Sequence, residues 1–140
     1  MTSPKILVRD FMHPVKHIFK LDTTIEEIVK TLAKNKIVGG PVVDADHKLV
    51  GFISEQNCIK QMLNNTYYCD SHEVASDIMR PEPLFVSPDD DVLKLAEDML
   101  NKRPKIYPVV EGDKIIGMIT RADILKALSL AKNEICSVKG

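Results

Sequence analysis

The stretch Gly117–Asp123 holds the residues of this sequence whose types and spacing could bind a ligand. Its glycine ends an apolar run, and Thr120 and Asp123 stand where a helix is predicted to begin. A helix N-terminus offers unpaired N–H groups and a positive potential to a phosphate. Thr120 could donate to a phosphate oxygen, and Asp123 could accept from both hydroxyls of a ribose. The pair could equally be structural, because Thr at the N-cap and an acid at N3 form a capping-box-like pair.

A related but uncharged stretch, Gly51–Asn57, lies earlier in the chain. Ser54 stands in the place of Thr120, and Asn57 stands in the place of Asp123. An amide makes weaker hydrogen bonds to hydroxyls than a carboxylate does. The earlier stretch therefore predicts a weaker version of the same site.

Both stretches close the two copies of an internal repeat. Val8–Pro14 aligns with Ala75–Pro81 at an offset of 67, and both segments contain Asp-x-Met-x-Pro. Pro41–Val43 aligns with Pro108–Val110 at the same offset. The predicted layout is repeat one at 8–63, a connector at 64–74, repeat two at 75–130 and a C-terminal tail at 131–140.

Each copy predicts the element order β-α-β-β-α after a turn at its Asp-x-Met motif. The first helix of each copy carries apolar residues at the i, i+3, i+4, i+7 spacing of a buried stripe. Thr23–Glu26 predicts a capping box before the helix of the first copy, and Asp90 is the expected cap in the second. The predicted strands include Ile18–Leu21, Pro41–Val43, Leu49–Ile53 and Leu84–Val86, and the predicted closing helices are Glu55–Leu63 and Arg121–Ser129.

One repeat of this length is too small to bury an adequate core by itself. Two copies packed by a pseudo-twofold axis would cover each other's apolar sheet surfaces. We therefore expect a mixed α/β (α+β) fold in which the two repeats form one globule.

Composition excludes several classes of protein. The formal net charge of −1 argues against a mainly electrostatic nucleic-acid binder. No apolar run approaches the roughly 20 residues that cross a bilayer, and the first residues lack a signal pattern. The three cysteines are far apart, which fits a reduced compartment better than a disulfide framework. We expect a cytoplasmic protein with no membrane or nucleic-acid partner.

Residue patterns for catalysis or metal binding are missing from the sequence. His13 and His17 are four apart, but Pro14 separates them and the segment is predicted as loop and strand. The acidic run Asp89–Asp91 lies at a helix start, where the helix dipole explains it better than Ca²⁺ does. No Gly-x-Ser-x-Gly elbow or phosphate-binding Gly-rich loop occurs. We expect no enzyme activity, no metal and no required cofactor.

The order, spacing and duplication of these motifs resemble a CBS-domain pair, also called a Bateman module. Each copy has Asp-x-Met near its start, Pro-Val-Val in the middle, and Gly, two apolar residues, Ser/Thr and then Asp/Asn at its end. The likeness covers about residues 8–130. It implies a stand-alone regulatory module that binds AMP, ADP, ATP or S-adenosylmethionine in the cleft between the repeats and signals to a separate, unidentified protein.

The resemblance also implies which residues touch the ligand. It assigns phosphate to Thr120 and ribose to Asp123, and it puts Lys105 where family members often hold a phosphate-binding basic group. The predicted ligand-binding set is Thr120, Asp123, Lys105, Ile106, Tyr107 and Arg121. The weaker second site is predicted at Ser54, Asn57, Val38, Gly39 and Gly40. The two glycines would let a ligand approach the backbone, or they serve only a tight turn.

Two further expectations follow. The duplicated amphipathic helices carry more apolar positions than one small module buries internally, which predicts a homodimer. The uncharged first copy also keeps a second function open, in which the chain binds no ligand and acts as a scaffold through protein contacts.

Overall fold

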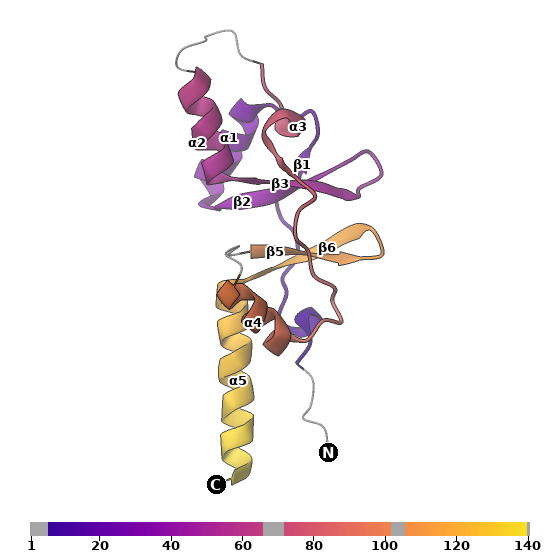
Figure 1. Ribbon diagram of the computed structural model, residues 1–140, viewed down its shortest axis with the longest axis vertical. Helices are drawn as coiled ribbons and strands as arrows, with labels where there is room; N and C mark the ends of the chain where they lie inside the picture. Colours follow the sequence, from indigo (N-terminus) through magenta and orange to yellow (C-terminus); the bar gives the residue numbers. More distant parts are fainter. Residues whose placement is uncertain (1–5, 66–71, 102–105, 140) are drawn as a thin grey trace. The chain divides into compact units, whose positions relative to one another are not determined.

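The computed structural model describes residues 6–65, 72–101 and 106–139, and the side chains of residues 65 and 134–139 lie outside this description. The chain forms two compact units, which we call the middle unit (residues 16–83) and the outer unit (residues 1–15 with 84–140) (Figure 1). These units do not follow the predicted repeat boundaries. Each unit takes its Asp-x-Met segment from the other repeat.

The middle unit is built on a four-stranded sheet of order β1-β2-β3-β4. The first two strands run parallel, and the other neighbours run antiparallel. The strands are β1 Phe19–Lys20, β2 Gly39–Val43, β3 Leu49–Ser54 and β4 Arg80–Pro81, and the helices are α1 Ile25–Asn35, α2 Glu55–Asn65 and α3 Ala75–Ile78. Helices α1 and α2 pack together (Figure 1), and the core between sheet and helices includes Phe19, Ile28, Val42 and Ile53.

Helix α1 forms where the apolar spacing predicts it. Ile25, Ile28 and Leu32 are buried on one stripe of the helix. Its cap is Thr24, whose side chain accepts a hydrogen bond from Glu27 N at 3.2 Å. The cap therefore lies one residue later than predicted, because the hydroxyl of Thr23 accepts from Lys20 N and closes the preceding turn.

The outer unit has a similar arrangement, but its sheet, as far as the structure describes it, has two strands in place of four. Its elements are η1 Val8–Asp10, α4 Val92–Asn101, β5 Ile106–Glu111, β6 Lys114–Thr120 and α5 Arg121–Lys139. The predicted strand Leu84–Val86 is reduced to one parallel bridge between Val86 and Val109. Pro83 and Pro88 flank this segment and lack the N–H groups that a longer ladder needs. The core includes Val92, Leu95, Val109 and Ile119.

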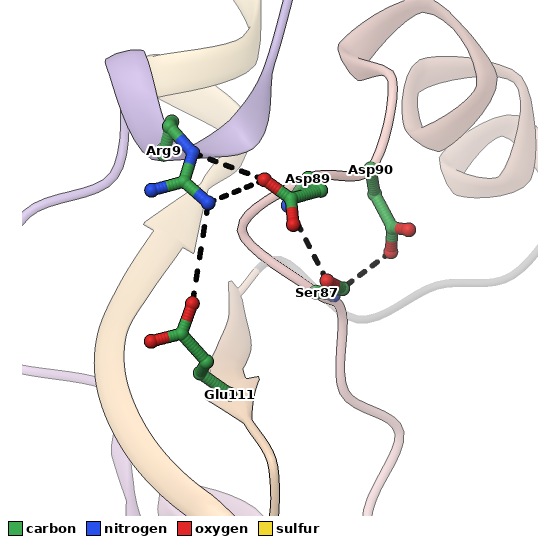
Figure 2. Close-up of polar contacts among 5 residues, drawn as sticks. All are labelled: Arg9, Ser87, Asp89, Asp90 and Glu111. Carbon is green, nitrogen blue, oxygen red and sulfur yellow. Dashed lines mark hydrogen bonds and ion pairs between the residues drawn. The ribbon is translucent and has the colours of Figure 1, made fainter.

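Two predictions at the ends of the outer helices need correction. Asp91, not Asp90, caps α4, since its side chain accepts from Leu93 N at 2.9 Å. Asp90 instead accepts from Ser87 N at 2.8 Å and closes the turn before the helix (Figure 2). Helix α5 continues to Lys139, so it runs through the segment that the sequence predicts as a tail.

The N-terminal segment is held to the outer unit by backbone and side-chain contacts. Val8 N donates to Asp90 O at 3.0 Å, and Arg9 N donates to Pro88 O at 2.9 Å. The Arg9 guanidinium pairs with Asp89 and lies 4.0 Å from Glu111 (Figure 2). The hydrogen bond with Asp89 raises the pKa of Arg9 above its ordinary value. These contacts lie just before His13, which pairs with Met118 of β6.

Each Asp-x-Met segment packs closely against a glycine of a neighbouring strand. His13 and Met118 exchange two backbone hydrogen bonds, both of 2.9 Å, beside Gly117. A Cβ at Gly117 would lie 2.9 Å from His13 O and 3.0 Å from Met12 Sδ. In the middle unit, Met79 fills the same space beside Gly51. Glycine is required at these positions because the neighbouring segment occupies the space of a side chain.

We expect Gly117→Ala to destabilise the chain by about 1–3 kcal/mol, the usual cost of overpacking. The new methyl group would push His13 and Met12 away from β6, because the nearest atom is a backbone oxygen that is already hydrogen-bonded. Chemical denaturation measures the loss of stability. Amide hydrogen exchange should show faster exchange at His13 and Met118.

Gly112→Ala is the matched control. Gly112 has a φ of +68°, and a Cβ there meets nothing within 4 Å. Its substitution should cost about 1 kcal/mol through backbone strain alone. It should leave the exchange rates at His13 and Met118 unchanged. Equal exchange rates in both variants would contradict the packing role of Gly117.

Candidate functional site

The candidate site is built around the first turn of α5. Strand β6 ends at Thr120, and the helix begins at Arg121. Asp123 Oδ2 accepts from Thr120 N at 2.8 Å and from Thr120 Oγ1 at 3.0 Å. Thr120 Oγ1 in turn accepts from Asp123 N at 3.2 Å. The structural part of the sequence interpretation is therefore confirmed, since the two side chains cap the helix reciprocally.

The capping bonds leave one carboxylate oxygen of Asp123 for other use. In the described part of the chain, the contacts of this carboxylate all fall on Oδ2. The side chain is 24% exposed. Oδ1 is thus an anionic acceptor held in one orientation, as recognition of a hydroxyl requires.

His13 is a site residue that sequence reasoning missed. Its Nδ1 lies 3.0 Å from Asp123 Oδ2, and the imidazole is 43% exposed. The sequence offers one signal for it: His13 is the second variable residue of Asp-x-Met-x-Pro, and the repeat aligns it with Arg80. That alignment does not say which segment lies beside Asp123, so the contact could be found only from the fold.

The first copy reproduces the capping geometry with neutral groups. Asn57 Oδ1 accepts from Ser54 N at 2.9 Å and from Ser54 Oγ at 2.9 Å, while Ser54 Oγ accepts from Asn57 N at 3.3 Å. The backbone N–H can bond only to the oxygen of the amide. The NH₂ group of Asn57 therefore takes the position that Oδ1 of Asp123 has in the second copy. The first copy offers a donor where the second offers an acceptor.

The other predicted residues of the second copy lie around this turn to different degrees. Ile106 pairs with Thr120 in the β5–β6 ladder, so the start of β5 adjoins the cap. Arg121 is exposed in the first turn of α5. Tyr107 is 3% exposed and belongs to the core, where burial, followed by the charge of Asp98, raises the pKa of its hydroxyl. Lys105 lies outside the described residues.

The glycines of the first copy lie in strand β2 and not in a tight turn. Gly39 pairs with Ser54, and a Cβ on Gly39 would lie 2.6 Å from Ile53 O. Close approach of the two strands is enough to explain this glycine. Val38 is 46% exposed, and its carbonyl accepts from Glu55 N at 3.0 Å at the start of α2.

Helices α4 and α5 enclose an apolar groove of about 800 Å³. Leu93, Leu100 and Leu125 lie along it and are 46%, 87% and 69% exposed. Helix α2 shows a corresponding apolar face in the middle unit, with Ile59, Met62 and Leu63 at 59%, 47% and 62% exposure. Large exposed apolar faces of this kind mark interaction surfaces.

Other classes of site have no support in the described residues. No group of three or more His, Cys, Asp or Glu side chains there could hold a metal ion. Within the same residues, no helix is long and apolar enough to cross a membrane. Cys58 is buried in the core of the middle unit, and burial raises the pKa of its thiol.

Comparison with known proteins identifies the domain family. The CBS domain model matches residues 8–64 and 75–130. The chain is 28% identical over 141 residues to the chloroplastic CBS domain-containing protein CBSX1 of Arabidopsis thaliana, a match that covers 79% of this chain and 58% of that protein. The chain thus spans about three fifths of this relative.

Two solved structures combine similar folds with bound adenosine compounds. One is CBSX2 in complex with AMP, with a TM-score of 0.79, 29% identity, and coverage of 90% of this chain and 98% of that chain. The other is the CBS domain pair of protein MJ0100 in complex with 5′-methylthioadenosine and S-adenosyl-L-methionine. It has a TM-score of 0.76 and 26% identity, and covers 90% of this chain and 98% of that one.

Proposed function

The chain belongs to the CBS domain family, and on this premise we propose that it is a regulatory module that binds an adenosine-containing nucleotide and signals to a protein partner. The observation that carries the proposal is the turn Thr120–Asp123, which holds a free carboxylate oxygen beside a helix N-terminus. AMP, ADP, ATP and S-adenosylmethionine are the candidate ligands. The AMP complex of CBSX2 and the S-adenosylmethionine complex of MJ0100 support this class of ligand.

We assign separate roles to the residues of the second copy. Asp123 Oδ1 accepts hydrogen bonds from the ribose hydroxyls, and the first turn of α5 faces the phosphate with its N–H groups. Ile106 adjoins the cap in the ladder, and Arg121 and Lys105 supply positive charge. Tyr107 supports the start of β5 from the core. None of these roles is catalytic, and we propose no enzyme activity and no required cofactor.

The chain is proposed to act as a homodimer in the cytoplasm. The groove between α4 and α5 and the apolar face of α2 give each repeat a surface for a second copy of the chain. A closed twofold arrangement covers such a surface on both partners. The turn at Thr120 would stay accessible when this surface is covered. A ligand that binds at this turn would then change the geometry of the dimer.

Asp123→Asn tests the ribose contact. The amide oxygen must accept from Thr120 N, so the variant keeps the cap and turns its NH₂ group outward, as Asn57 does. We expect AMP affinity to fall by about 10- to 100-fold, which corresponds to the loss of a charged hydrogen bond of roughly 1.5–3 kcal/mol. Isothermal titration calorimetry measures the affinity.

2′-Deoxy-AMP and a second variant complete this test. The deoxy compound should bind the unchanged chain less tightly than AMP does. The substitution Asp123→Asn should lower the affinity for the deoxy compound by a smaller factor than it lowers the affinity for AMP. Asp123→Ala should also lose about 1 kcal/mol of stability with the cap. Equal AMP affinities for the unchanged chain and Asp123→Asn would leave Asp123 with a capping role only and favour the scaffold function.

The second copy should bind AMP at least about tenfold more tightly than the first, which corresponds to a difference of about 1.4 kcal/mol in binding free energy. The second copy offers a carboxylate at Asp123 and a basic group at Lys105, where the first offers Asn57 and Val38. Calorimetry should give one strong AMP site per chain. Asn57→Asp combined with Val38→Lys should add a second strong site. A ligand-bound structure with the first copy filled and the second empty would overturn this ranking.

Light scattering at tens of micromolar should return twice the chain mass of 15.7 kDa. Leu125→Asp places a charge in the apolar groove and should return the single-chain mass. Lys126→Asp, on the next and exposed residue of α5, is the control and should leave the dimer intact. A single-chain mass for the unchanged protein would reject the dimer.

A further inference from the structure

We propose that His13 is a specificity-determining residue of the nucleotide site: its protonation makes the site favour phosphate-bearing over uncharged adenosine ligands. The inference rests on the proposed function and deepens it. Its basis is the contact between His13 Nδ1 and Asp123 Oδ2 at 3.0 Å. Sequence and capping pattern give Asp123 a role, but they give none to the histidine beside it.

His13 is placed firmly although its side chain is half exposed. Its N–H and carbonyl both bond to Met118 at 2.9 Å, and Gly117 leaves room for this close approach. The backbone position is thus independent of the side chain. The imidazole reaches the carboxylate from the N-terminal segment, while Thr120 holds the same oxygen from the side of the helix.

In the part of the chain that the structure describes, the elements around His13 carry a small set of charged groups. Asp123 is the titratable group in contact with it, and Arg121 stands in the same first turn of α5. The charged residue of β6 is Lys114, at the hairpin end of the strand. In η1, Arg9 pairs with Asp89, and Asp10 completes the short helix. Among these described groups, the pair His13–Asp123 is the one whose net charge changes when His13 is protonated.

The two states of the pair treat a phosphate differently. With neutral His13, the pair carries the single negative charge of Asp123 and repels an anionic ligand. With protonated His13, the pair is neutral overall, and Asp123 Oδ1 still accepts from a hydroxyl. Histidine is the side chain whose charge ordinarily changes between about pH 5 and pH 8. Adenosine carries no charge, so protonation gives it no corresponding gain.

The first copy provides an internal comparison. Arg80 pairs with Phe52 in the register in which His13 pairs with Met118. Arg80 is exposed, and its guanidinium has no ion pair with the described residues. The equivalent register position thus carries a permanent cation, Arg80, in the copy with neutral Asn57, and a histidine in contact with anionic Asp123 in the other. This difference makes the second copy the proton-dependent one.

The test is calorimetry of the full chain with AMP and with adenosine at about pH 6 and pH 8. The variants are His13→Asn and His13→Arg. Asparagine keeps a donor at the position of Nδ1 but does not titrate, and arginine installs the permanent cation of the first copy. The phosphate of AMP itself titrates near pH 6. To remove this effect, each affinity is divided by the affinity of His13→Asn for the same ligand at the same pH.

The AMP affinity ratio of the unchanged chain to His13→Asn should rise about fivefold from pH 8 to pH 6, within the usual range of coupling between two sites. The adenosine ratio should stay constant. His13→Arg should bind AMP more tightly than His13→Asn at both pH values. By reciprocity, binding of AMP near pH 7 should take up more protons in the unchanged chain than in His13→Asn, as calorimetry in two buffers measures.

An AMP ratio that is the same at both pH values would overturn this inference and leave His13 as a group that only positions Asp123. An equal rise for adenosine would overturn it as well, because the effect would not depend on the phosphate. Binding of neither compound to the unchanged chain would overturn the proposed function itself. The two failures are therefore distinguishable.

Discussion

The close approach of the Asp-x-Met segments to the glycine-bearing strands is the constraint on which both candidate sites depend. Met12 and Met79 occupy the space that a Cβ would need at Gly117 and Gly51. A side chain at either glycine would separate the segment from its strand. In the outer unit, the same contact carries His13 to Asp123. The motif and the strand glycine are therefore two halves of one packing contact, although they lie far apart in the sequence.

Much of the fold was predictable because its signals are local. The buried stripe of α1 and the short apolar segments Pro41–Val43 and Leu49–Ile53 predicted elements that match α1, β2 and β3 closely. The helix caps were displaced by one residue, since Thr23 and Asp90 bond to the preceding turn and leave the cap to their neighbours. Adjacent residues of the same type compete for such roles, and only the backbone path decides between them.

The site was predictable only as far as it is local. The pairing of Thr120 with Asp123 spans one helical turn, so the sequence shows it directly. His13 lies 110 positions before Asp123, and its place follows from the membership of residues 1–15 in the outer unit. A repeat alignment gives equivalent positions in two copies, but it does not say which copy each segment joins. The exchange of the Asp-x-Met segments is therefore a property of the fold and was missed.

The comparison of Asn57 with Asp123 shows how one atom changes what a site can bind. Both side chains must accept from a backbone N–H at the helix start, and this requirement fixes their orientation. The remaining atom is then a donor in Asn57 and an acceptor in Asp123. Backbone satisfaction, which stabilises the fold, thus also determines the polarity that each copy presents to a ligand. His13 beside Asp123 adds a cation-capable group that the cap alone does not supply, and Arg80 holds the equivalent register position in the first copy.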